Sequence, residues 1–145
     1  MNTTFKIIVT DDDEDDQQII KTAFHDISND VEIVACKGCH DLMDYLSSED
    51  PATITAIILD VNMPVIDGFQ CLKELKKKEA FKNIPVFILS TMRNVNKFDD
   101  FFDHGAANCF SKPSNYASYK EILLNIYDGL KKRSMLLALI SSTIV

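Results

Sequence analysis

The chain has 145 residues, which is enough for one domain with a single core and at most a short extension. Apolar residues make up 46% of it and charged residues 26%, a composition that is too apolar for a disordered chain. The formal net charge of -7 argues against a nucleic-acid partner, because phosphate backbones are held mainly by lysine and arginine.

The N-terminal segment, residues 1–6, lacks the basic start, the long apolar run and the small-residue cleavage site of a signal peptide. We therefore expect a cytoplasmic protein. The chain has four cysteines, of which Cys36 and Cys39 form a Cys-x-x-Cys pair. A chain with room for a core does not need a disulfide scaffold, and zinc would need two further ligands nearby. We expect reduced, structural thiols.

Apolar runs of strand length alternate with segments of helical period. The predicted strands cover residues 5–9 or 5–10, 31–36, 54–59, 86–89 and 109–111. Apolar residues at steps of three and four predict helices around residues 19–27, 42–46, 69–75, 95–102 and 119–130. Five strand and helix pairs in this order predict a doubly wound α/β fold, (βα)5, with a parallel five-stranded sheet between helical layers.

Ligands of doubly wound folds bind beyond the carboxyl ends of the strands, so the polar residues at those ends carry the functional question. Five such residues follow the first, third, fourth and fifth predicted strands: Asp11, Asp12, Asp60, Ser90 and Lys112. Carboxylates gathered at one edge repel one another unless a cation shares the site. All-oxygen ligands favour Mg²⁺, and Ser90 and Lys112 would complete a site for a phosphoryl group.

The acidic run that continues from Asp13 to Asp16 has a simpler interpretation. Carboxylates at the start of a helix are stabilised by the helix dipole, so we interpret Asp13, Glu14, Asp15 and Asp16 as a solvated cap. That interpretation does not explain why a second apolar strand also ends on aspartate and a third on serine.

Four segments together resemble the receiver domain of two-component response regulators: residues 7–16, Leu59 to Pro64 with Asp67-Gly68 behind it, Ser90-Thr91, and Lys112-Pro113. The resemblance covers residues 6–133 and is nearest to stand-alone, chemotaxis-type receivers. It implies the flavodoxin-like strand order 2-1-3-4-5.

The resemblance also implies a role for each matching residue. Asp60 is similar to the phospho-acceptor, Asp12 to a direct metal ligand and Asp11 to a ligand acting largely through water. Asn62 would offer its backbone carbonyl to Mg²⁺, which leaves its side chain free to vary. Ser90 resembles the switch hydroxyl and Lys112 the lysine that neutralises the phosphoryl group, with a cis bond between Lys112 and Pro113.

Two positions depart from the commonest pattern of the family. Cys109 stands where many receivers carry an aromatic switch residue, and Met92 stands where the side chain influences attack by water. An apolar Met92 predicts a long-lived phosphoryl group. Acceptance of the phosphoryl group by Asp60 does not depend on either position.

Three other functions compete with this one. An aspartyl-phosphate hydrolase of the haloacid-dehalogenase type needs a second acid two positions after its nucleophile, where this chain has Asn62. A flavin or nucleotide carrier needs a glycine-rich loop where this chain has Asp11 to Asp13. A degenerate receiver that binds partners without phosphorylation is disfavoured because all the site positions are filled.

The expected function is therefore a phosphorylation-activated switch and not an enzyme, apart from weak self-phosphorylation and self-dephosphorylation. The expected partners are a sensor histidine kinase or a histidine phosphotransfer protein, and a downstream protein reached by protein–protein contact. We expect the receiver domain to cover residues 1–133.

Residues 134–145 form an apolar extension of about half the length that a membrane span needs. Two arrangements stay open for this tail. Either the last helix continues and folds back on its own domain, or Leu136, Leu137 and Ile140 dock on a second copy to give a homodimer.

Overall fold

The computed structural model describes residues 4–91 and 97–144 of the chain. Eleven elements follow one another within these residues: β1 (Phe5–Thr10), α1 (Glu14–Ile27), β2 (Val31–Cys36), α2 (Cys39–Ser47), the 3-10 turn η1 (Pro51–Thr53), β3 (Ala56–Leu59), α3 (Gly68–Lys77), β4 (Val86–Ser90), α4 (Phe98–Asp103), β5 (Asn108–Ser111) and α5 (Tyr116–Ile144). The alternation of strands and helices agrees with the sequence prediction.

The five strands form one parallel sheet in the order β2-β1-β3-β4-β5. The predicted fold class and strand order are therefore confirmed. The third strand starts at Ala56 and not at Ile54, because the backbone N–H of Ile54 donates to the carbonyl of Pro51 and so closes the η1 turn. All four residues of β3 are buried, as expected of a central strand covered on both faces.

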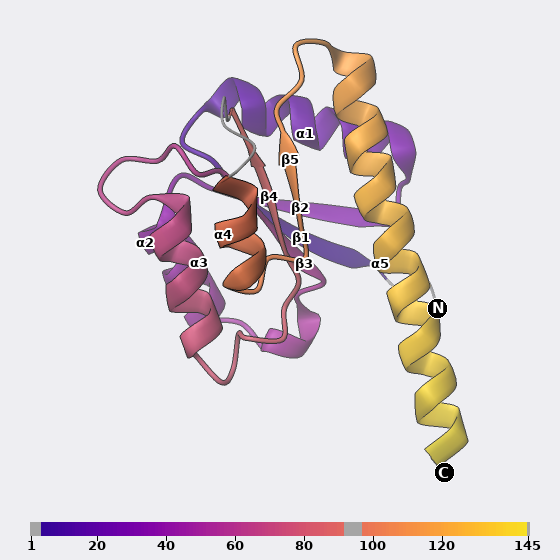
Figure 1. Cartoon of the computed structure of the whole chain (residues 1–145). Helices are drawn as coiled ribbons and strands as arrows, with labels where there is room; N and C mark the ends of the chain where they lie inside the picture. The colour runs from indigo at the N-terminus through magenta and orange to yellow at the C-terminus, as the bar shows by residue number, and fades with distance from the viewer. Residues whose placement is uncertain (1–3, 92–96, 145) are drawn as a thin grey trace.

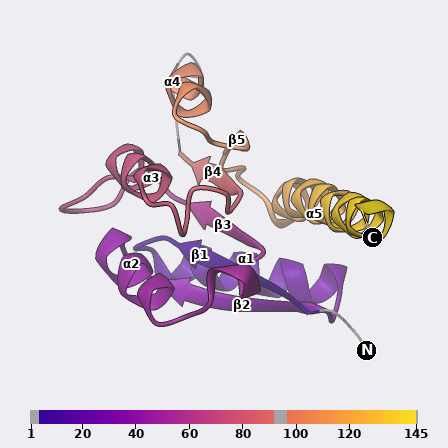
Figure 2. The same ribbon diagram turned by 90° about the horizontal axis from the view of Figure 1, so that it is seen from below.

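Helices cover both faces of the sheet (Figures 1 and 2). On one face, Ile20 and Phe24 of α1 and Leu123 of α5 pack on alternate residues of β1 and β3. On the other face, Leu42 of α2 and Leu72 of α3 pack on the opposite sides of the same strands. The apolar faces of the helices that the sequence predicts therefore pack on the sheet and form these two core layers.

Local signals fix the helix ends near the functional edge of the sheet. The Asp13 side chain accepts hydrogen bonds from the backbone N–H groups of Asp15 and Asp16 and so caps α1, as predicted. Asp67 caps α3 in the same way. Behind it, a Cβ atom on Gly68 would lie 2.4 Å from the backbone oxygen of Asp60, so only glycine allows α3 to start this close to β3.

The last helix, α5, continues without a break through residue 133 to Ile144, and its yellow end projects beyond the rest of the domain in Figure 1. Five apolar residues of this projection are between 51% and 65% exposed: Met135, Leu136, Leu137, Leu139 and Ile140. The first arrangement expected for the tail therefore holds only in part. The last helix does continue, but its apolar residues do not pack back on the domain. No helix within the described ranges combines the length and the apolar character needed to cross a membrane.

The expectation of four reduced thiols is wrong for one pair. Cys39 and Cys71 form a disulfide between α2 and α3, with their Cα atoms 5.7 Å apart. Cys36, the other member of the Cys-x-x-Cys pair, is a buried free thiol, as is Cys109. Cys39 and Cys71 are 32 residues apart in the sequence, and the packing of α2 beside α3 brings them together.

Candidate functional site

Three carboxylates meet beyond the carboxyl ends of β1 and β3. One ligand oxygen from each of Asp11, Asp12 and Asp60 lies within 4.8 Å of the other two. Asp11 and Asp60 are buried, with 2% and 4% of their surface exposed, whereas Asp12 faces solvent. The parallel register places Thr10 beside Leu59, so the residues that follow them emerge at the same edge of the sheet.

Asp60 is held by hydrogen bonds from two neighbouring segments. The Ser90 hydroxyl at the end of β4 donates to Asp60 Oδ1 at 2.6 Å, and the backbone N–H of Asn62 donates to the same oxygen at 3.3 Å. Ser90 Oγ in turn accepts from the backbone N–H of Val61 at 3.2 Å. These bonds fix the orientation of a carboxylate that burial would otherwise destabilise.

Lys112 follows β5 and reaches across the edge of the sheet to three carboxylates. Its Nζ atom lies 2.8 Å from Asp11 Oδ2, 2.8 Å from Asp16 Oδ2 and 3.6 Å from Asp60 Oδ2. Its side chain is only 9% exposed. This ammonium group places a positive charge beside Asp60, although its closest ion pairs are with Asp11 and Asp16.

The electrostatics of the site follow from this arrangement. Burial, to which the negative charge of Asp60 adds, raises the pKa of Asp11 to about 6, although its hydrogen bond with Lys112 acts in the opposite direction. For Lys112, burial lowers the pKa, but hydrogen bonds to Asp11 and Asp16 outweigh it and hold the pKa well above its usual range. Lys112 therefore stays positively charged at physiological pH.

The donor set fits a hard divalent cation. Asp11, Asp12, Asp16 and Asp60 bring four carboxylates to this edge, and Lys112 balances only one of them when all are ionised. Mg²⁺ binds oxygen ligands at about 2.0–2.1 Å, so its ligand atoms lie up to about 4 Å apart, close to the spacing of the three carboxylates of the cluster. A cation here would also relieve the repulsion between them.

The structure brings together all the strand-end residues predicted from the sequence: Asp11, Asp12, Asp60, Ser90 and Lys112. It also assigns contacts to the Asn62 side chain, which was expected to be free to vary. The Asn62 amide donates to Ser90 Oγ at 3.3 Å and to the backbone oxygen of Thr91 at 3.0 Å. Asn62 therefore connects the β3–α3 loop to the end of β4.

Asp16 is the residue that the sequence interpretation missed. It was assigned to a solvated cap, yet it forms an ion pair with Lys112 and accepts a hydrogen bond from Tyr119 of α5 at 3.4 Å. No spacing in the sequence singled it out, because Asp11 and Asp12 precede α1, whereas Asp16 lies in the first turn of α1 with Glu14 and Asp15. Its neighbours Asp13, Glu14 and Asp15 are exposed, as expected.

Three further expectations concern the surroundings of the site. The expectation of a cis bond between Lys112 and Pro113 is wrong: this bond is trans, like every other peptide bond of the described residues, and trans is the intrinsically favoured form. Cys109 packs in the core on the α3 side of the sheet. Met92 lies outside the described residues, so the expectation of a long-lived phosphoryl group stays a prediction.

Residues 7–124 match the family model described as the response regulator receiver domain. Hybrid signal transduction histidine kinase L of Dictyostelium discoideum is 31% identical over 121 residues, which cover 81% of this chain but 7% of the kinase. Two-component response regulator ORR13 of Oryza sativa subsp. japonica is 28% identical over 81% of this chain and 93% of its own length.

Solved structures give the same picture. The phosphorylated cyanobacterial phytochrome response regulator RcpA superposes with a TM-score of 0.77 at 28% sequence identity, over 85% of this chain and 91% of that one. The fold and the matched family therefore both indicate a receiver domain, and the acidic cluster lies at the carboxyl edge of its sheet.

Proposed function

Because this chain belongs to the response regulator receiver family and is a phospho-accepting signalling switch of two-component systems, we propose that Asp60 accepts the phosphoryl group. The observation that supports Asp60 most directly is its position. It is a buried carboxylate that follows the central strand, within 3.6 Å of an ammonium group and in a 2.6 Å hydrogen bond with a hydroxyl group. Nothing in the comparisons supports the haloacid-dehalogenase alternative.

In the proposed reaction, an Asp60 carboxylate oxygen attacks the phosphorus atom of the donor. A bond forms between that oxygen and phosphorus, while the bond from phosphorus to the donor atom breaks and its electron pair leaves with the donor. Lys112 holds a positive charge where negative charge develops on the transferred group, and the Ser90 hydroxyl is placed to donate to a phosphoryl oxygen.

Receivers bind Mg²⁺ through acidic residues, and we propose that Asp11, Asp12, Asp60 and the backbone carbonyl of Asn62 hold it in this chain. Bound there, the ion supplies positive charge to the phosphoryl oxygens. Asp12 is the exposed member of the cluster and is placed to bind directly. Both oxygens of Asp11 already accept hydrogen bonds, at 2.9 Å from the Asp13 backbone and at 2.8 Å from Lys112, which favours contact through water.

The proposed donor is a sensor histidine kinase or a histidine phosphotransfer protein, and the proposed location is the cytoplasm, where such donors act. We propose that residues 1–133 form the receiver unit, that it works as a stand-alone, chemotaxis-type regulator, and that its own chemistry is confined to weak self-phosphorylation and self-dephosphorylation. The proposed output is contact with a downstream protein through the face made by α4, β5 and α5, because Ser90 ends β4 and Lys112 follows β5 beside that face.

We further propose that the apolar extension, residues 134–145, joins two copies of the chain. Exposure of Leu136, Leu137 and Ile140 in the described structure supports a partner for them, since each would release about 1.5–3 kcal/mol on full burial before the cost of association. Sedimentation of the full chain and of a chain cut after Arg133 tests this proposal. A full-length monomer at tens of micromolar, with or without a phosphate mimic, would contradict it.

Incubation with a small acyl-phosphate and Mg²⁺, followed by intact-mass measurement, tests the acceptor. The native chain should gain one phosphoryl group only when Mg²⁺ is present. Asp60→Asn should gain none, whereas Asp67→Asn, which changes an exposed aspartate of the next loop, should label like the native chain. Labelling of Asp60→Asn at the native level would remove the assignment.

A further inference from the structure

The disulfide between Cys39 and Cys71 joins the beginnings of two helices that cover the same face of the sheet. Cys39 is the first residue of α2, and Cys71 lies in the first turn of α3. The start of α3 is itself packed against the backbone of Asp60 through Gly68. The disulfide therefore ties α2 to the segment that follows the proposed acceptor.

All four cysteines are buried, but Cys36 and Cys109 are free thiols. Burial raises the pKa of Cys36 to about 11, and burial does the same for Cys109. Thiols of this kind stay protonated near neutral pH, and a protonated thiol is a poor nucleophile. Cys39 is the first residue of α2 and is less deeply buried than Cys71, of which nothing is exposed.

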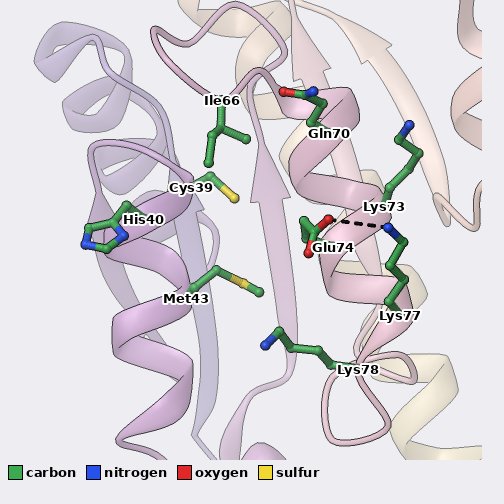
Figure 3. Close-up of a pocket in the computed structure, with 9 residues that line it drawn as sticks. All are labelled: Cys39, His40, Met43, Ile66, Gln70, Lys73, Glu74, Lys77 and Lys78. Carbon is green, nitrogen blue, oxygen red and sulfur yellow. Dashed lines mark hydrogen bonds and ion pairs between the residues drawn. The ribbon is translucent and has the colours of Figure 1, made fainter.

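A groove of about 630 Å³ between α2 and α3 reaches the pair at Cys39, of which 4% is exposed (Figure 3). Cys39 lines this groove and Cys71 does not, so an external thiol would meet the Cys39 sulfur first. In Figure 3 the Cys39 sulfur and the Met43 side chain point toward α3, and Lys78 extends between the two helices.

The groove is basic although the chain as a whole is acidic. Three lysines and one glutamate of α3 and its C-terminal end line it: Lys73, Glu74, Lys77 and Lys78. Lys77 lies 3.5 Å from Glu74, so the remaining two lysines give the groove an excess of positive charge. Such a groove attracts small anions more than small cations.

From the buried pair, the groove and its charge we propose that Cys39 and Cys71 form a reversible redox site that exchanges with an anionic low-molecular-weight thiol of the glutathione class. This proposal goes beyond phosphoryl transfer and does not depend on Asp60. In a reducing cytoplasm, the location proposed above, a disulfide persists only transiently and reports on the redox state.

The exchange balances in two steps. A glutathione thiolate attacks the Cys39 sulfur, a new sulfur–sulfur bond forms, and the electron pair of the old one leaves on Cys71, which takes up a proton. A second glutathione thiolate attacks the glutathione sulfur of this mixed disulfide and releases Cys39. Two glutathione molecules are oxidised to one glutathione disulfide while the protein disulfide is reduced to two thiols; oxidation of the protein is the reverse.

Equilibration of the full-length protein in defined ratios of reduced and oxidised glutathione tests reversibility. After trapping of free thiols and peptide mass analysis, the oxidised fraction should follow the glutathione ratio, with Cys39 linked to Cys71 while Cys36 and Cys109 stay trapped as thiols. A Cys36→Ser variant should titrate like the native chain. A pair that stays oxidised, or stays reduced, at every ratio would overturn the proposal, as would linkage to Cys36 or Cys109.

The rate of reduction tests the role of the groove. At equal thiolate concentration and low salt, glutathione should reduce the disulfide at least about threefold faster than the cationic thiol cysteamine, and high salt should reduce the difference. Lys73→Glu together with Lys78→Glu should abolish or reverse the preference, whereas Lys132→Glu, an exposed change on α5, should keep it. Equal rates for the two thiols in the native chain would overturn the assignment of the ligand. Acyl-phosphate labelling of the same samples reports separately on Asp60.

Discussion

The Ser90 hydroxyl donates a 2.6 Å hydrogen bond to Asp60 Oδ1, although 30 residues separate the two in the sequence. Ser90 ends β4 and Asp60 follows β3, so both lie at the same edge of two parallel neighbouring strands. The phospho-acceptor proposed here is therefore in direct contact with the residue proposed to report its phosphorylation. A phosphoryl group on Asp60 would carry about -1.5 to -2 charges in place of the single negative charge of the carboxylate, and so has to displace or recruit Ser90.

Replacement of Ser90 by alanine should slow acyl-phosphate labelling of Asp60 by about tenfold, because one donor to the transferred group is lost. Ser90→Thr keeps the hydroxyl and should label within about threefold of the native rate. Single-turnover labelling followed by intact mass measures both variants. Ser114→Ala, an exposed serine near the same edge, is the control and should behave like the native chain. Native rates for Ser90→Ala would show that the hydroxyl has no part in transfer.

The two aspartates that follow β1 should contribute unequally to Mg²⁺ binding. Asp11→Ala should weaken it by about tenfold, the usual loss for a residue that acts through another ligand, and Asp12→Ala should weaken it more. A metal titration monitored by amide shifts compares them, with Asp15→Ala as the control from the same acidic segment. Equal losses, or a larger loss for Asp11→Ala, would contradict the ligand roles proposed here.

Removal of the Lys112 charge should separate metal binding from phosphoryl transfer. Lys112→Met should slow labelling of Asp60 by about a hundredfold or more, because the positive charge beside the transferred group is lost. The same change should tighten Mg²⁺ binding several-fold, since a cation no longer competes for Asp11 and Asp60. Lys132→Met should change neither quantity. Weaker Mg²⁺ binding by a folded Lys112→Met protein would contradict this electrostatic account.

The raised pKa of Asp11 predicts a pH dependence of stability without metal. Below about pH 6 the folded protein holds Asp11 neutral, whereas the unfolded chain ionises it near pH 4. Between about pH 4 and pH 6 the unfolded chain has released this proton while the folded protein still holds it, so the free energy of unfolding should fall as the pH rises over this range and level off above about pH 6. Urea denaturation in EDTA measures this loss, and Mg²⁺ should reverse it at pH 7.5. If Asp11→Asn shows the same loss as the native chain, another group is responsible.

The sequence was enough to predict the sheet and the central part of the site. Strand-end residues share one edge whenever the strands are parallel, so Asp60, Ser90 and Lys112 could be grouped from element order alone. Asp16 could not, because its contact depends on the direction in which the first turn of α1 faces β5. The disulfide was missed for a similar reason, since it depends on how α2 packs against α3.

For the tail, too, the sequence pattern bears on the local helix but not on how that helix packs. The apolar pattern of the tail left two arrangements open, one of which had α5 continue past Arg133, and α5 does continue. Whether the exposed side chains would reach their own domain depends on the angle at which α5 leaves the sheet. That angle is fixed by the packing of Leu123 and Ile126 on the core and not by the tail itself.

The most direct test of the account is the mass of the native chain and of Asp60→Asn after incubation with a small acyl-phosphate, with Mg²⁺ and with EDTA. The account predicts one phosphoryl group on the native chain with Mg²⁺, none in EDTA, and none on Asp60→Asn under either condition. A native chain that gains no phosphoryl group with Mg²⁺, or an Asp60→Asn variant that gains one as readily as the native chain, would contradict it.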